Sequence, residues 1–221
     1  MAASSENLPL RPAAAPLAAA REIPAEPPDV GARALSVASR LLCGATSFFF
    51  VAFVFAYFYL RSLDQDHMWR PAHIHPNQAL GVAFVACLVA SALASILAGR
   101  QMKASRSWLS LGLASLALGL AAVALQCVEY TTQHWGPTNG AYASVFSGWT
   151  AFYMIAVLAT MFWLETLVAT ELRARRTPAH SQGDVHEPDR LIAPGLDAAV
   201  FYWSYLAAIG VLMYVILYPL Q

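Results

Sequence analysis

Five long stretches of the chain contain almost no charged residue. They cover residues 41–60, 79–98, 107–128, 142–168 and 198–219, and Glu165 is the one acidic or basic residue among them. About 20 apolar residues carry an α-helix across the roughly 30 Å of bilayer hydrocarbon. The stretches are apolar on every face rather than along one stripe, which excludes a water-soluble helical core. The sequence therefore predicts an all-α polytopic membrane protein with a five-helix transmembrane domain over residues 34–221.

The distribution of basic residues predicts the orientation of these helices. Eleven of the thirteen Lys and Arg residues lie in the N-terminal segment, the second loop and the fourth loop, which five spans place on one side. Because short loops rich in Lys and Arg stay on the cytoplasmic side, the N-terminus is expected in the cytoplasm and the C-terminus outside. Residues 1–33 are rich in Ala and Pro and lack apolar periodicity, so they are expected to form a disordered cytoplasmic tail.

Composition narrows the class of protein and its compartment. Charged residues make up 12% of the chain and the formal net charge is zero, so no basic surface for nucleic acid is expected. Arg outnumbers Lys twelve to one and Ala is very frequent, which is typical of a GC-rich bacterial genome and indicates the bacterial cytoplasmic (plasma) membrane. Cys43, Cys87 and Cys127 lie at different depths of three predicted helices, so they are expected to be small packing residues without disulfides.

The histidines do not predict a redox centre in this chain. All six lie in predicted loops, so none is placed to ligate a membrane-embedded haem or copper by the usual imidazole route. Four of them, His67, His73, His75 and His134, share the outer side. Two alternatives stay open for these four, a metal-binding cluster or separate solvated side chains.

Two acids lie inside or at the end of predicted spans and are candidates for a polar role. Glu129 ends the third span within Gln126-x-x-Glu129-Tyr130, and Gln126 shares its helix face because the two are three residues apart. Glu165 lies in the cytoplasmic third of the fourth span. Acids within a membrane are expensive and are usually functional or paired. The alternatives to a functional role are a structural bond at the helix end for Glu129, and a bond to polar neighbours or an arginine for Glu165.

Several short motifs follow one another in a characteristic order. They are Phe49-Phe50 and Ala56-Tyr57-Phe58 in the first span, Trp69-Arg70-Pro71 in the loop after it, Leu125-Gln126-x-x-Glu129-Tyr130 at the end of the third, Tyr142-Ala143-Ser144-Val145-Phe146 at the start of the fourth and Tyr202-Trp203 in the fifth. Over roughly residues 34–219 this order resembles subunit III of the haem-copper terminal oxidases, the cytochrome c oxidase subunit III family, in its shorter five-helix form.

The resemblance implies a subunit without a redox centre, whose haem- and copper-bearing partners carry the electron transfer of aerobic respiration. Such a subunit binds the side of catalytic subunit I, supports the assembly and stability of the oxidase, and holds phospholipids between its helices. The candidate interface or lipid residues are Gln126, Glu129, Tyr130, Tyr202, Trp203 and Glu165. Two alternatives stay open, an accessory protein of nitric-oxide reductase with a similar fold and a small free-standing membrane transporter.

Some positions depart from the pattern of that family. This chain has Thr46 where the family usually has a buried glutamate in the aromatic helix. Tyr153, Ala156 and Ser204 stand at positions usually held by histidine, and Ala207 at one usually held by aspartate. The polar interior of the usual bundle is thus largely replaced by hydroxyl and apolar groups. The resemblance therefore implies a divergent or accessory subunit that lacks the glutamate associated with proton uptake.

Overall fold

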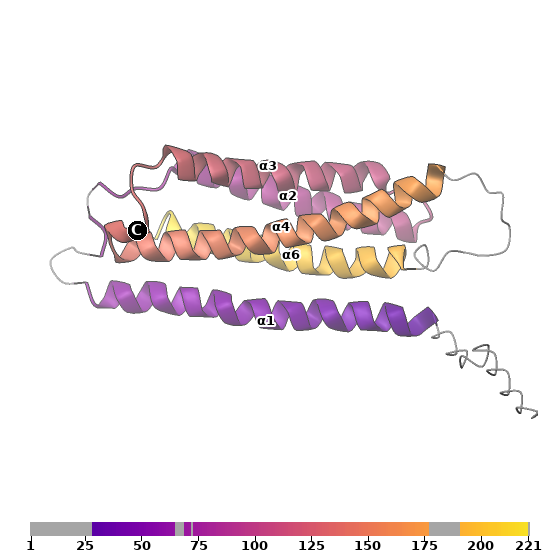
Figure 1. Cartoon of the computed structure of the whole chain (residues 1–221), viewed down its shortest axis with the longest axis horizontal. Helices are drawn as coiled ribbons and strands as arrows, with labels where there is room; N and C mark the ends of the chain where they lie inside the picture. The colour runs from indigo at the N-terminus through magenta and orange to yellow at the C-terminus, as the bar shows by residue number, and fades with distance from the viewer. Residues whose placement is uncertain (1–27, 65–68, 72, 177–190, 221) are drawn as a thin grey trace, which may run out of the picture.

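Five long α-helices lie side by side along one axis of the molecule (Figure 1). The computed structural model describes residues 28–64, 69–71, 73–176 and 191–220. Within these ranges the elements are α1 (Pro28–Ser62), α2 (Gln78–Lys103), α3 (Leu109–Thr132), the short 3-10 turn η2 (Pro137–Asn139), α4 (Ala141–Arg176) and α6 (Ile192–Leu217), with no strand. All five α-helices are long and apolar enough to cross a membrane. The predicted all-α, five-helix fold is confirmed.

Helix α1 begins earlier than the sequence predicts. Residues 28–33, which the sequence assigns to the disordered tail, form the first turns of this helix. Pro28 occupies the first helical position, where proline is tolerated because the amide hydrogen that it lacks would have no partner. Residues 29–40 contain no further proline, so nothing ends the helix before the apolar stretch. Residues 1–27 of the expected tail lie outside the described residues.

Small residues let neighbouring helices approach closely. Ser91 of α2 donates a hydrogen bond to the carbonyl oxygen of Ser115 in α3 at 2.6 Å, and both residues are buried. Gly119 of α3 faces α4 so closely that an added Cβ would lie 2.2 Å from Sδ of Met161. Close packing of this kind is what holds membrane helices together, because lipid removes the hydrophobic drive between them.

The cysteines are free, as predicted. Cys43 and Cys87 pack against the hydrophobic core, as expected of small packing residues. Cys127 differs because it is exposed on α3. In a helix that is apolar all round, sequence alone does not reveal which face turns inward.

Aromatic side chains dominate the core between α2, α4 and α6. Trp149 and Tyr153 of α4, Trp203 of α6 and Phe84 of α2 are almost completely buried. The hydroxyl of Tyr153 donates to the carbonyl oxygen of Leu206 at 2.7 Å. The side chain of Tyr153 therefore reaches from α4 to α6. Its buried hydroxyl has a hydrogen-bond partner there, which offsets the free-energy cost of burying a polar group.

We expect Gly210→Ala to destabilise this core. An added Cβ would lie 2.5 Å from the hydroxyl oxygen of Tyr153 and 3.0 Å from Cδ1 of Leu88, so α6 would have to move outward. Overpacking of this kind costs about 1–3 kcal/mol. The measurement is the Tm of the purified protein in detergent. Gly44→Ala is the matched control, because a Cβ there meets nothing within 4 Å; equal Tm values for both variants would contradict the packing described.

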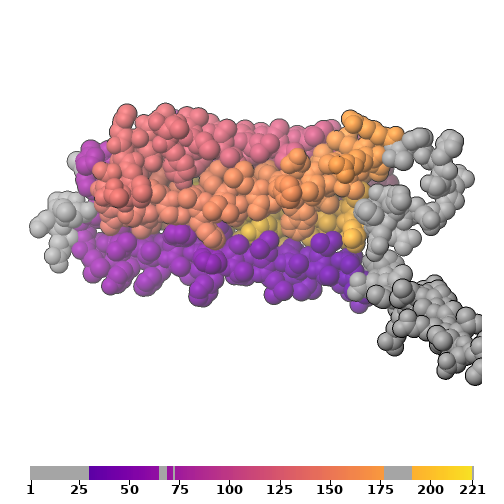
Figure 2. All heavy atoms as spheres, in the orientation of Figure 1, coloured from indigo at the N-terminus to yellow at the C-terminus, as the bar shows by residue number. Residues whose placement is uncertain are grey.

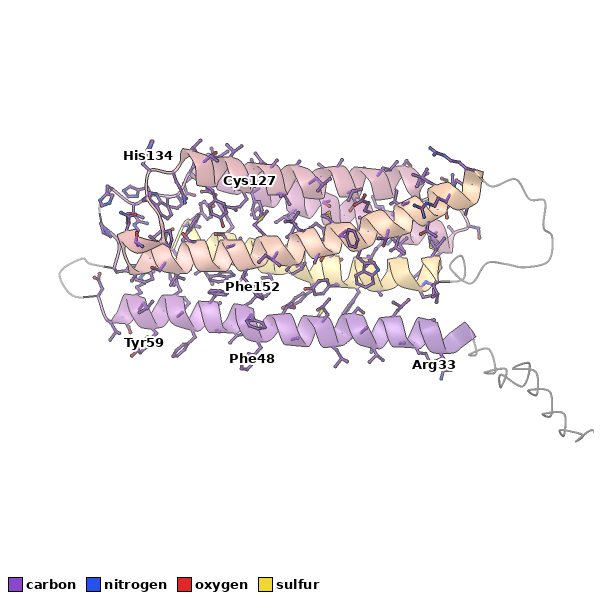
Figure 3. The ribbon with its side chains drawn as sticks, in the orientation of Figure 1. Arg33, Phe48, Tyr59, Cys127, His134 and Phe152 are labelled. Atoms are coloured by element: carbon purple, nitrogen blue, oxygen red, sulfur yellow. The ribbon has the colours of Figure 1, made fainter. Side chains whose placement is uncertain are left out.

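Helix α1 is the least embedded of the five. Only 11% of its most apolar stretch is buried inside the protein, against 28–44% for the other four helices. Phe48 and Tyr59 point away from the bundle, whereas Phe152 lies between α4 and α1 (Figure 3). The ring of Phe152 is 4.8 Å from that of Phe49, centroid to centroid. The outward aromatic face of α1 is therefore left for lipid or another large surface.

The end of α1 is tied to the segment that follows α6. The hydroxyl of Tyr57 donates to the carbonyl oxygen of Leu220 at 3.0 Å, and Nη1 of Arg61 donates to the same oxygen. Tyr57 is fully buried. This contact, which we call the Leu220 latch, joins the first and last helices at one end of the bundle.

Candidate functional site

Glu129 forms the centre of a buried polar network at the end of α3. Its carboxylate accepts hydrogen bonds from the backbone amide of Asn77 at 3.2 Å, from Nε2 of Gln126 at 3.1 Å and from the hydroxyl of Tyr218 at 2.5 Å. Glu129 is 2% exposed and Gln126 is 1% exposed. Because a buried carboxylate is tolerated only with such donors, the network requires all three segments to be in place. It joins α3 to the start of α2 and the end of α6.

Local structure positions each partner of Glu129. The side-chain oxygen of Asn77 accepts hydrogen bonds from two amides of the first turn of α2, so Asn77 caps that helix. The ring of Tyr218 lies against Gly81, where an added Cβ would be 2.5 Å from it. Burial raises the pKa of Tyr218, which follows the α6 span, and the Glu129 carboxylate raises it further. The phenol therefore stays protonated at neutral pH and acts as the donor.

A polar pocket of about 310 Å³ opens beside this network. Its lining includes Glu129 together with three loop histidines that the structure describes, His73, His75 and His134. Nδ1 of His75 lies 3.2 Å from Nη2 of Arg70. The structure thus brings these three histidines to one pocket, while His67 lies outside the described residues. Among the residues described, no group of three His, Cys, Asp or Glu side chains is arranged to hold a metal ion.

Tyr130, the last residue of the Gln-x-x-Glu-Tyr motif, joins α3 to α4. Its hydroxyl donates to Oγ1 of Thr150 at 2.5 Å. Thr150 in turn donates to the carbonyl oxygen of Phe146 at 2.6 Å, one turn earlier in α4. Two residues of the motif therefore form hydrogen bonds to different helices. Glu129 connects α3 to the start of α2 and the end of α6, and Tyr130 connects α3 to α4.

Trp203 and Tyr202 lie on different sides of α6. Nε1 of Trp203 donates to Oγ of Ser91 at 3.1 Å, and Ser91 continues the chain of bonds to Ser115 in α3. Tyr202 instead faces α1, in a largely apolar groove of about 230 Å³ that Thr46 also lines. Trp203 thus lies at the centre of the bundle, whereas Tyr202 lies in the groove between α1 and α4.

Glu165 does not join any of these networks. It is exposed on α4, and within the described parts of the chain it makes no hydrogen bond or ion pair. The expected bond to a polar neighbour or an arginine is therefore not found among the described residues. Its neighbour Glu171 does pair, because Nε of Arg175 lies 2.7 Å from its carboxylate.

The hydroxyl groups of Thr46 and Ser204 bond to backbone within the bundle. Oγ1 of Thr46 donates to the carbonyl oxygen of Leu42 at 2.7 Å, and Oγ of Ser204 donates to that of Val200 at 2.7 Å. Both bonds run one turn back along the same helix, which is the usual way to satisfy such a side chain in a membrane helix.

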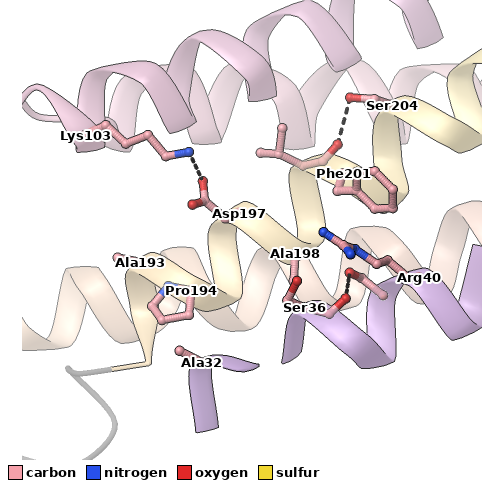
Figure 4. Close-up of a pocket in the computed structure, with 12 residues that line it drawn as sticks. Ala32, Ser36, Arg40, Lys103, Ala193, Pro194, Asp197, Ala198, Phe201 and Ser204 are labelled. Atoms are coloured by element: carbon pink, nitrogen blue, oxygen red, sulfur yellow. Dashed lines mark hydrogen bonds and ion pairs between the residues drawn. The ribbon is translucent and has the colours of Figure 1, made fainter. Parts of the chain in front are cut away.

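A second large pocket, of about 710 Å³, opens at the opposite end of the bundle between α1, α2 and α6 (Figure 4). Arg40 and Lys103 line it, and Nζ of Lys103 lies 3.0 Å from a carboxylate oxygen of Asp197. Phe201 and Val200 supply apolar lining. A pocket that combines basic groups with an apolar wall suits an amphiphile, which has a charged headgroup and an apolar tail.

Asn77 and Tyr218 are the site residues that sequence reasoning missed. Asn77 carried a usable signal, because asparagine just before an apolar run is a helix-capping residue. Tyr218 carried none, since one tyrosine near the end of an aromatic-rich chain does not predict a partner in another helix.

Comparison with known proteins places the chain in a family. The family profile described as Cytochrome c oxidase subunit III matches residues 30–220. The cytochrome c oxidase subunit 3 of Ornithorhynchus anatinus is 27% identical, that of Latimeria chalumnae 28% and that of Mus musculus 27%. Each match covers 77% of this chain and 64% of the relative, so the chain spans less than two thirds of the length of these relatives. The chain belongs to the cytochrome c oxidase subunit III family.

Proposed function

We propose that the chain is a non-redox subunit III of a bacterial haem-copper terminal oxidase, located in the cytoplasmic membrane. The observation that carries the proposal is the family match over residues 30–220, which takes in all five helices. Its part is to pack against catalytic subunit I and other subunits and to support their assembly and stability. Haem and copper belong to those partners, because the apolar spans of this chain contain no histidine.

The motif residues have a structural part in this proposal. Glu129, Gln126 and Tyr130 bond between helices, and Trp203 does the same at the centre of the bundle. These bonds would fix the shape of the surface that a partner subunit meets. No proton-delivery role is proposed, because Thr46 occupies the place of the family glutamate and is not titratable at physiological pH.

Phospholipid is the proposed ligand of the pocket that Arg40 and Lys103 line. An anionic headgroup would meet Arg40 beside the Lys103–Asp197 ion pair, while an acyl chain would lie along Phe201 and Val200. Basic pockets between helices at the cytoplasmic side bind such headgroups. This placement agrees with the orientation proposed for the chain, in which the end of α2 and the start of α6 face the cytoplasm.

The orientation predicts where an engineered cysteine can be labelled. In a background with Cys127→Ser, which removes the exposed native thiol, Leu10→Cys should react with a membrane-impermeant maleimide only after the inner membrane is permeabilised. The reason is that eleven of thirteen basic residues share the N-terminal side. Labelling of Leu10→Cys in intact spheroplasts would contradict this orientation.

The test of the function is affinity purification of the chain in a gentle detergent, followed by a reduced-minus-oxidised optical spectrum. Partners with oxidase-type haem at a fixed ratio to the chain would support the proposal. Only b- and c-type haem, together with nitric-oxide consumption in place of oxygen consumption, would identify the nitric-oxide reductase alternative. A colourless preparation that remains free of partners after chemical crosslinking in the membrane would overturn both and leave the free-standing transporter.

A further inference from the structure

The outward face of α4 carries an apolar stripe that ends in an acid. Ile155, Leu158 and Phe162 are exposed at 66%, 46% and 67%, and Glu165 continues the stripe. The intervals between them are three or four residues, so they lie on one face of the helix. This spacing is the one that packs helices against each other as a seam. Helix α4 faces the viewer in Figure 2.

Glu165 lies well inside the apolar part of the bundle. Along α4, Val168 lies against Gly112 of α3 and Met161 against Gly119, and Glu165 falls between these two levels. At 1.5 Å per residue this level is roughly 10 Å inside the start of α3. Side chains in a helix lean toward its N-terminus, and the N-terminus of α4 is at the far end. The carboxyl group of Glu165 therefore leans toward the middle of the membrane rather than toward the nearer boundary.

Lipid is a poor environment for this side chain. A carboxylate at the centre of a membrane helix costs about 2.5–3.5 kcal/mol on insertion scales, and such residues pair or face a protein interior. Within the described residues Glu165 has no partner. The exposed stretch of α1 differs, because no acidic or basic residue lies between Arg40 and Arg61, so lipid satisfies that surface.

We infer that the α4 stripe is the docking surface for a transmembrane helix of a neighbouring subunit, and that this helix presents an arginine or lysine to Glu165. The charge of Glu165 selects a basic partner, and the apolar stripe beside it selects a membrane helix. The groove of about 230 Å³ between α1 and α4, which Ile155 and Trp163 line, provides room for a side chain of that helix. The yellow surface of α6 is visible between α4 and α1 in Figure 2.

Photocrosslinking in the intact complex tests the docking surface. The photoreactive residue p-benzoylphenylalanine is placed at position 162, and the product is identified by mass spectrometry. The expected product joins the chain to a membrane helix of another polypeptide with an arginine or lysine in its cytoplasmic third. A product with lipid alone, with a second copy of this chain, or with a helix that lacks a basic residue at that depth would overturn the inference.

A pair of charge-removing substitutions tests the role of Glu165 itself. Glu165→Gln should lower the retention of the partner subunit in detergent by about tenfold, because it leaves a basic group unpaired in the interface. Glu171→Gln is the matched control, since it removes an acid from the same helix that already pairs with Arg175, and its retention should stay within about twofold. Equal retention in both variants would overturn the inference.

The inference rests on the proposed function only in requiring a partner subunit, and the two fail in different ways. A wild-type chain that brings down no haem-bearing partner, even after crosslinking, counts against the proposed function. Haem-bearing partners that copurify normally, with only lipid crosslinked at position 162, count against the α4 docking surface alone.

Discussion

Glu129→Ala is expected to destabilise the bundle by about 3–5 kcal/mol, because each buried donor that loses its acceptor costs about 1–3 kcal/mol. The substitution leaves the hydroxyl of Tyr218 and the side-chain amide of Gln126 buried without their acceptor, and it removes the acceptor of the partly buried backbone amide of Asn77. It also opens a cavity between α2, α3 and α6. The measurement is the Tm of the purified protein in detergent, together with its elution profile on size-exclusion chromatography.

Two further variants separate the contributions to this network. Glu129→Gln keeps the volume but offers one acceptor oxygen where the carboxylate offers two, so it should cost about 1.5–3 kcal/mol. Tyr218→Phe removes a single donor and should cost less than Glu129→Ala. An unchanged Tm of the isolated chain in Glu129→Gln, combined with loss of partner subunits, would mean that Glu129 acts across a subunit interface instead.

Trp203→Ala is the second substitution expected to have a large effect. Trp203 is 1% exposed, and its indole fills the space between α2, α4 and α6 while Nε1 bonds to Ser91. Removing a buried tryptophan side chain costs about 3–5 kcal/mol, because the neighbouring side chains close only part of the cavity. The Tm in detergent reports this loss.

Matched variants of Trp203→Ala test whether burial is the cause. Trp203→Phe retains most of the volume and leaves Ser91 bonded to Ser115, so its cost should be much smaller. Phe201→Ala removes an aromatic ring from the same helix at a site that is 51% exposed, and it should lower the Tm little. A loss of Tm in Phe201→Ala as large as that in Trp203→Ala would contradict the assignment of the core.

The helices are predictable from this sequence because membrane spans depend on the length of an apolar stretch. The rotation of each helix is less predictable, since a helix that is apolar on every side gives no signal for its inner face. Cys127 and Glu165 illustrate this, because both turn outward although they lie in the same kind of segment as buried residues. The start of α1 at Pro28 shows a related limit. Charged residues mark the end of the apolar stretch, but the helix continues past them.

The network around Glu129 is predictable only in part. Gln126 follows from helix periodicity because it lies on the same face of α3. Asn77 and Tyr218 lie 52 and 89 residues away in the sequence, so their contact with Glu129 arises only when the helices pack. The grouping of three loop histidines at one pocket has the same origin, because the loops that carry them meet only after α2 and α3 are paired.

The Leu220 latch sets an order for the biogenesis of the chain. Translation completes α1 long before Leu220 leaves the ribosome, because Tyr57 and Leu220 are 163 residues apart. Little of α1 is held by the rest of the bundle, so during synthesis this helix can enter the bilayer without its final neighbours. The C-terminal end of α1 gains its contact with Leu220 only when the segment after α6 is in place. This end of the bundle therefore closes only after the segment that follows α6 has been synthesised.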